Sequence, residues 1–65
     1  MKKEDIYIHK KTGNEYSIIS YKSRIKFDGK WFDAVIYEPT NTINPYDCFV
    51  RKVEDFNEKF ILKID

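Results

Sequence analysis

Apolar and polar side chains alternate on both sides of an Asp28-Gly29 pair in the middle of the chain. Residues 21–27 and 30–37 each repeat with a period of two, which is typical of half-buried β-strands. An Asp-Gly pair between two such segments predicts a β-hairpin, because a type I′ turn needs a positive φ at both central residues. The two-residue loop also sets the register, which pairs Phe27 with Lys30, Lys26 with Trp31, Ile25 with Phe32 and Arg24 with Asp33.

The remaining pattern predicts three further strands and one helical turn. In chain order, we expect strands at residues 6–10, 15–27, 30–38, 48–52 and 59–64, a turn at 11–14, a loop with Pro45 at 40–47, and a single helical turn at 53–57. The strand at 15–27 is unusually long, so we expect it to bend near Ser20 and to serve two sheets. Pro39 ends the next strand because it lacks an N–H donor.

Five short strands joined by tight turns predict an all-β domain that spans residues 1–65. A chain of this length buries little surface, and an open five-stranded sheet leaves two hydrogen-bonding edges. Closure removes the edges and encloses the apolar face. We therefore expect a small five-stranded SH3-like barrel with one short helical turn before the last strand. The alternative is an open, curved meander that dimerises to cover its exposed face.

The hairpin register sorts the side chains onto two faces. We expect one face to contribute to the core, and its members are Tyr21, Ser23, Ile25, Phe27, Phe32, Ala34 and Ile36. We expect the other face to meet solvent, and its members are Lys22, Arg24, Lys26, Trp31, Asp33, Val35 and Tyr37. Cross-strand pairs such as Arg24 with Asp33 and Lys26 with Trp31 stabilise a hairpin by about 0.2–1 kcal/mol each. The solvent face is either a ladder that only keeps the sheet soluble or a contact patch centred on Trp31, since Trp and Arg often anchor interfaces.

Charge and cysteine content narrow the functional class. The chain has 65 residues with 12 basic and 11 acidic side chains, a net charge of +1. Nucleic-acid-binding proteins usually have a clear basic excess, so this balance argues against a strong electrostatic pull toward nucleic acid. The single cysteine, Cys48, excludes an internal disulfide and suits a reducing compartment. No apolar run approaches the ~20 residues of a membrane span, and we expect a cytoplasmic protein.

No group of residues carries a recognisable catalytic motif. His9 is the only histidine, so a metal site would lack ligands, and we expect Cys48 to be a small buried hydrophobe. We therefore expect a protein that is not an enzyme and uses no cofactor. The tyrosines are either core residues or the lining of a groove for an extended peptide; they are Tyr7, Tyr16, Tyr37 and Tyr46. We expect Glu54, Asp55 and Glu58 to form an acidic surface.

Several short motifs along residues 6–60 resemble a small uncharacterised domain family of bacteria and their phages. The motifs are Tyr7-x-His9-Lys10-Lys11-Thr12-Gly13-x-x-Tyr16, Val35-Ile36-Tyr37, Phe49-Val50-Arg51 and Phe56-x-x-Lys59-Phe60. The resemblance implies an SH3-like β-barrel with no established activity. It also suggests that the matching positions Tyr7, His9, Tyr37 and Arg51 are surface binding residues.

Three functions follow as hypotheses. The first is a non-enzymatic binding protein, a phage or prophage accessory product that docks on a host protein and inhibits a defence or regulatory factor. Its expected contact residues are Lys22, Arg24, Lys26, Trp31, Tyr37, Tyr7, His9 and Arg51. The alternative is a nucleic-acid-binding barrel that uses the aromatic and basic hairpin face. A third is a structural subunit that works as an oligomer, and the sequence leaves both monomer and homodimer open.

Overall fold

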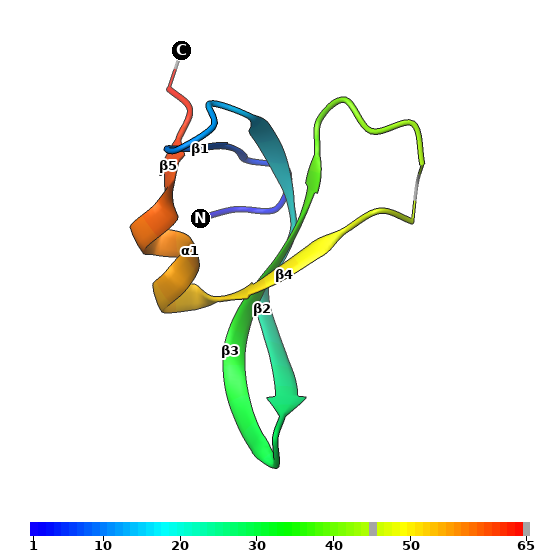
Figure 1. Ribbon diagram of the computed structural model, residues 1–65, viewed down its shortest axis with the longest axis vertical. Helices are drawn as coiled ribbons and strands as arrows, with labels where there is room; N and C mark the ends of the chain where they lie inside the picture. Colours follow the sequence, from blue (N-terminus) through cyan, green and yellow to red (C-terminus); the bar gives the residue numbers. More distant parts are fainter. Residues whose placement is uncertain (45, 65) are drawn as a thin grey trace.

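The strands and the helix follow one another in the predicted order. The computed structural model describes residues 1–44 and 46–64, so Pro45 lies outside the described residues. The elements are β1 (Ile6–His9), β2 (Glu15–Phe27), β3 (Lys30–Pro39), β4 (Phe49–Lys52), α1 (Val53–Lys59) and β5 (Phe60–Leu62) (Figure 1). The strand bounds agree with the predicted ones within two residues at each end. The helix is two residues longer than the single turn that we expect.

The five strands form one antiparallel sheet in the order β4-β3-β2-β1-β5. Strands β1 to β4 follow a meander, and β5 returns to pair with β1 at the far edge. Helix α1 connects the two edge strands, β4 and β5 (Figure 1). The all-β class with one short helix is therefore confirmed. The expectation that β2 serves two sheets is wrong, because β2 bonds to β1 and β3 within a single curved sheet.

The Asp28-Gly29 turn has the predicted geometry. Both residues have a positive φ, 53° at Asp28 and 77° at Gly29, as a type I′ turn requires. The structure also confirms all four predicted pairs, which are Phe27 with Lys30, Lys26 with Trp31, Ile25 with Phe32 and Arg24 with Asp33. Local sequence alone thus determines the register at this end of the hairpin.

Strand β2 bends where we expect it, near Ser20. The β2–β3 register shifts twice, between Ile18 and Ser20 and between Ser20 and Ser23. Each shift places an extra residue on β2, as in a β-bulge, which increases the local twist and bends the strand. A hydrogen bond of 2.6 Å between the hydroxyls of Ser20 and Ser23 spans the second bulge.

The core lies between the inner half of the sheet and helix α1. Its buried cluster is Ile18, Val35, Tyr37, Phe56 and Phe60, with Tyr7, Tyr16, Tyr21 and Val53 packed against it. The rings of Phe56 and Phe60 stack with their centroids 4.2 Å apart. Residue Lys52 at the N-cap makes no side-chain cap hydrogen bond, and an isolated helix of this length is unstable in water. Burial of Phe56, which is fully covered, therefore stabilises α1.

The structure corrects the predicted burial of three hairpin residues. Val35 and Tyr37, which we expect on the solvent face, are only 0% and 3% exposed, whereas Phe27, which we expect in the core, is 70% exposed. Along β3, Val35 and Tyr37 have the same parity as Trp31, so all three side chains lie on one face. Helix α1 covers only the inner half of that face, and the outer half extends past the core (Figure 1).

Candidate partner-binding surfaces

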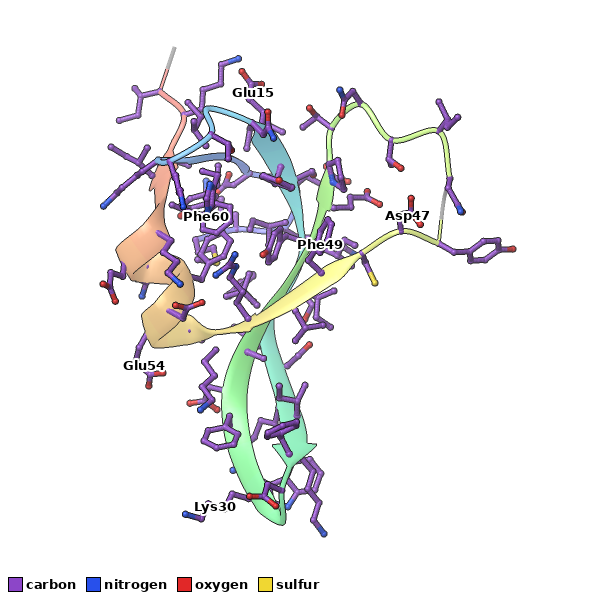
Figure 2. All side chains as sticks on the ribbon, viewed as in Figure 1. Glu15, Lys30, Asp47, Phe49, Glu54 and Phe60 are labelled. Carbon is purple, nitrogen blue, oxygen red and sulfur yellow. The ribbon has the colours of Figure 1, made fainter. Side chains whose placement is uncertain are left out.

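The outer half of the hairpin, residues 22–33, projects from the core and is here named the hairpin arm (Figure 1). Lys30 lies close to its tip (Figure 2). Strands β2 and β3 continue through the arm, and among residues 1–44 and 46–64 no helix or third strand lies against its tip. Two large apolar side chains, Phe27 at 70% and Trp31 at 56% exposure, meet solvent here. Exposed aromatic side chains of this size frequently mark contact sites.

Cations surround Trp31 on one face of the arm. The Arg24 guanidinium carbon and the Lys26 Nζ lie 5.7 Å and 6.0 Å from the centroid of the indole ring. Arg24 Nε is also 3.6 Å from Asp33 Oδ1. The predicted cation–indole contact and ion pair are thus confirmed. Each is worth only about 0.5–1 kcal/mol at an exposed position, so they orient the side chains more than they stabilise the fold.

The opposite face of the arm is apolar. It carries Ile25, Phe27 and Phe32, which alternate with the charged positions, and Lys52 from β4 places its Nζ 3.9 Å from the centre of the Phe32 ring. The alternation predicts that these three residues are apolar and belong to the core. Ile25 and Phe32 are half-buried, and only Phe27 is exposed. The exposure of Phe27 follows from the length of the hairpin, since no other element reaches its tip in the described part of the chain.

Two of the predicted contact residues, Tyr7 and Tyr37, lie in or against the core and not on the arm. The ring of Tyr7 packs edge-on against Phe56 at 5.2 Å. Burial, and to a lesser extent the carboxylate of Asp5, raises the pKa of Tyr7. Burial likewise raises the pKa of Tyr37, and its hydrogen bond from Arg51 opposes this effect. Lys22, by contrast, lies exposed at the base of the arm.

Arg51 and His9 line the same hollow, beside the C-terminal part of α1. Arg51 Nε donates a hydrogen bond of 2.6 Å to Tyr37 Oη, and Nη1 donates one of 2.7 Å to Asp55 Oδ2. Both hydrogen bonds raise the pKa of Arg51, and the bond to Asp55 has the larger effect. The pKa of Asp55 is lowered mainly by its hydrogen bond from Arg51 and, to a smaller extent, by its hydrogen bond from Lys59. The acidic residue Asp55 therefore holds two cations in place and is not simply acidic surface.

His9 and Arg51 belong to a hollow that we name the basic cleft. Its volume is about 420 Å³, and its lining residues are His9, Lys10, Lys11, Arg51, Glu58 and Lys59. Lys59 Nζ lies 3.0 Å from Asp55 Oδ1, and Lys10 Nζ donates to the Glu58 carbonyl oxygen at 2.9 Å. The His9 ring contacts Phe60 edge-on at 4.8 Å. The cleft forms because β1 pairs with β5, which places His9 opposite Phe60.

The sequence did not indicate three of the cations in the basic cleft. Lys10 and Lys11 belong to the turn after β1, and Lys59 ends α1, far along the chain. Only the antiparallel pairing of β1 with β5 brings these segments side by side. His9, Lys10 and Lys11 are adjacent in the sequence, but no local pattern connects them to Arg51 or Lys59, so the sequence alone could not identify the cleft.

Neither surface has the groups expected of a metal site. Among residues 1–44 and 46–64, no three His, Cys, Asp or Glu side chains lie close enough together to hold an ion. Cys48 is exposed, so its predicted burial is wrong. It immediately precedes the edge strand β4 and does not belong to it. Helix α1 is too short to cross a membrane, and no longer helix occurs in the described part of the chain.

Comparison with known proteins adds no relative. No protein-family model, no curated protein and no solved structure matches the chain. The functional argument therefore rests on the chemistry of the hairpin arm and the basic cleft.

Proposed function

We propose that the protein is a non-enzymatic binding protein that docks on a partner protein through the hairpin arm. The observation that carries this proposal is the exposure of Phe27 at 70% and Trp31 at 56% on opposite faces of one projecting hairpin. Fully desolvated aromatic side chains contribute a large share of the binding energy of protein interfaces. An arm with an aromatic residue on each face can insert into a groove and bury both.

The charges of the arm favour an acidic rim on the partner. Its charged side chains are Lys22, Arg24, Lys26, Lys30, Asp28 and Asp33, four cations against two anions. A positive excess steers the arm toward an acidic surface and fixes its orientation there. The type I′ turn and the four cross-strand pairs hold the arm in one shape before binding, which lowers the entropic cost of association. Binding then acts by steric occupation of the partner's surface.

The family resemblance supports two more specific proposals, one on the architecture and one on the biological role. We infer an SH3-like barrel whose gap between β4 and β5 is bridged by α1, supported by the meander order and the return of β5 to β1. We also infer an accessory protein of a phage or prophage that inhibits a host factor in the cytoplasm. Amide hydrogen exchange tests this barrel. The amides that pair β5 with β1 should be as protected as those of β2 and β3, whereas the outward amides of β4 face the gap and should exchange freely. Fast exchange at the β1–β5 pairs would contradict the barrel.

Single-stranded nucleic acid is the second candidate partner of the arm. One observation favours it, the placement of Arg24 and Lys26 beside the exposed indole of Trp31. Bases stack on such aromatic side chains while adjacent cations neutralise the phosphates. Fluorescence anisotropy with a labelled oligo-dT strand distinguishes the two candidates. Binding that weakens steeply between 50 and 200 mM salt, on the order of tenfold or more, supports nucleic acid, and no binding at low salt excludes it.

Capture of partners from a bacterial lysate, followed by affinity measurement on the isolated partner, tests the protein–protein interaction. Trp31→Ala should weaken binding by about 30-fold or more, as for an interface hot spot. The control is Tyr46→Ala, which removes an aromatic side chain that is 88% exposed but lies outside the arm. Equal affinities for the wild type and Trp31→Ala would remove the arm from the mechanism.

A further inference from the structure

The basic cleft carries a positive charge that the chain as a whole lacks. Its lining residues include four cations, Lys10, Lys11, Arg51 and Lys59, against one anion, Glu58, whereas the net charge of the chain is +1. Asp55 neutralises part of this charge through Arg51 and Lys59. Arg51 has five N–H donors, of which its hydrogen bonds to Tyr37 and Asp55 use two. The cleft thus keeps donors and charge for an anionic group.

An aromatic hollow adjoins the basic cleft. It has a volume of about 140 Å³ and shares His9 and Arg51 with the cleft, and its other lining residues are Thr12, Tyr16, Tyr37, Phe49 and Phe60. Phe49, at its rim, is 48% exposed and contacts Tyr16 edge-on at 6.1 Å. A ligand that spans both compartments needs an anionic group beside an apolar one.

The edge of β4 favours an extended peptide over a small anion. In the described part of the chain β4 pairs with β3 alone, so its other edge offers backbone donors and acceptors to a further strand. A third hollow of about 650 Å³ is lined by all four β4 residues, Phe49, Val50, Arg51 and Lys52, together with Tyr37 of β3 and Asp55 of α1. Space for a ligand therefore borders β4 along its whole length.

We propose that the basic cleft, the aromatic hollow and the edge of β4 together form a second binding site, which takes an extended acidic peptide of a partner protein. A carboxylate of the peptide binds Arg51 and Lys10. An apolar side chain packs against Phe49, and the peptide backbone adds to the edge of β4. This site uses no residue of the hairpin arm, so the protein can engage two chemically different surfaces.

Nuclear magnetic resonance titration of the 15N-labelled protein tests this site. The probe is a capped eight-residue peptide that alternates glutamate and leucine, and its control alternates lysine and leucine. Addition of the glutamate peptide should shift the amide signals of residues 9–14 and 49–52 and leave those of residues 24–31 in place. The lysine peptide should produce no shifts.

Charge reversal on each surface provides matched variants. The double substitution Lys10→Glu with Lys11→Glu should weaken binding of the glutamate peptide about tenfold, as expected for the loss of two exposed ion pairs. Lys22→Glu with Lys26→Glu on the arm reverses the same charge and should change the affinity less than about twofold. Circular dichroism of both variants checks that they are folded.

Three outcomes would overturn the second site. Amide shifts confined to the hairpin arm would show that the peptide binds there. Equal binding of the lysine peptide would show that the positive charge of the cleft does not select the ligand. Displacement of the peptide by inorganic phosphate at equal concentration would define a small-anion site instead. Trp31→Ala keeps the two proposals separate, because it should weaken partner binding through the arm by about 30-fold or more and leave peptide binding at the basic cleft unchanged.

Discussion

The hairpin arm and the core are built from the same two strands, β2 and β3, but they have opposite environments. At the inner half, α1 and β5 cover one face, and Val35 and Tyr37 are buried beneath them. At the outer half, the same face carries Trp31 in solvent. Along β3 the side chains alternate in the same way in both halves. The difference shows that the covering elements, and not the alternation, decide which apolar residues become core and which become contact surface.

The two regions also differ in what holds them together. Most contacts in the arm are local, between residues joined by a two-residue turn, and the contact of Lys52 with Phe32 is the exception. Contacts in the core join segments far apart in the chain, such as Tyr37 with Phe56 at 5.2 Å and Tyr7 with Phe56 at 5.2 Å. Substitutions in the core should therefore affect global unfolding, while substitutions in the arm should affect local order and binding.

The largest expected effect comes from Phe56→Ala. Phe56 is fully buried, so its truncation should lower the free energy of unfolding by about 3–5 kcal/mol. Urea denaturation followed by circular dichroism measures this change. Phe27→Ala removes the same side chain from the arm and should cost less than about 0.5 kcal/mol. Similar losses for the two variants would contradict the contrast between core and arm. If Phe56→Ala is unfolded, Phe56→Leu should still be less stable than Phe27→Leu.

The second effect is that of Gly29→Ala in the turn of the arm. Gly29 has a φ of 77° and open space around a built Cβ, so the cost is conformational, about 1–2 kcal/mol. This cost should appear as faster amide hydrogen exchange at residues 24–33, with exchange in the core unchanged. Gly29→Asn should restore most of the protection, since Asn tolerates this conformation. Equally faster exchange in the core would show that the arm is not an independent unit.

The third effect is that of Tyr37→Phe, which removes the hydroxyl that accepts a hydrogen bond from Arg51. Loss of one hydrogen bond from a charged donor should cost about 1.5 kcal/mol in urea denaturation. Tyr46→Phe, at an 88% exposed position, is the matched control and should leave stability unchanged. An unchanged stability of Tyr37→Phe would mean that water replaces the hydroxyl at no cost.

The smallest effect is a pH dependence that arises from Asp55. Its pKa is lowered by Arg51 and Lys59, so its ion pairs stabilise the fold fully above the ordinary Asp pKa of about 3.9. This contribution is lost as the pH falls through the lowered pKa. The effect should be modest, because the Asp55 side chain is 36% exposed. Melting temperatures measured from pH 6 to pH 2 should fall less steeply for Asp55→Asn than for the wild type, and parallel curves would rule out this role.

The sequence was sufficient to predict features that depend on neighbouring residues. The Asp28-Gly29 turn, the Arg24–Asp33 pair and the bend near Ser20 all follow from local geometry. The burial of Val35 and Tyr37 did not, because it depends on where α1 lies relative to the sheet. Cys48 was assigned to a buried strand because its neighbours are apolar, yet β4 is an edge strand, and Cys48 lies just outside it.

The two candidate sites also differ in whether they depend on neighbouring residues or on segments far apart in the chain. The contact of Trp31 with Arg24 and Lys26 follows from the hairpin register and was predicted. The basic cleft depends on the pairing of His9 with Phe60, a contact between the two ends of the chain that no local pattern encodes. The alternation of apolar and polar residues therefore predicts a surface on a single hairpin. It does not predict a cleft that forms between distant segments.

The positions of the only tryptophan and the only cysteine give the protein a built-in pair of reporters. Trp31 is already largely in solvent, so its emission should change little on global unfolding and respond instead to whatever covers the arm. Cys48 is accessible and immediately precedes Phe49, which allows a thiol-reactive dye to be attached next to the proposed second binding site. Occupancy of the two surfaces can thus be followed separately, by intrinsic and by extrinsic fluorescence, in the wild-type chain.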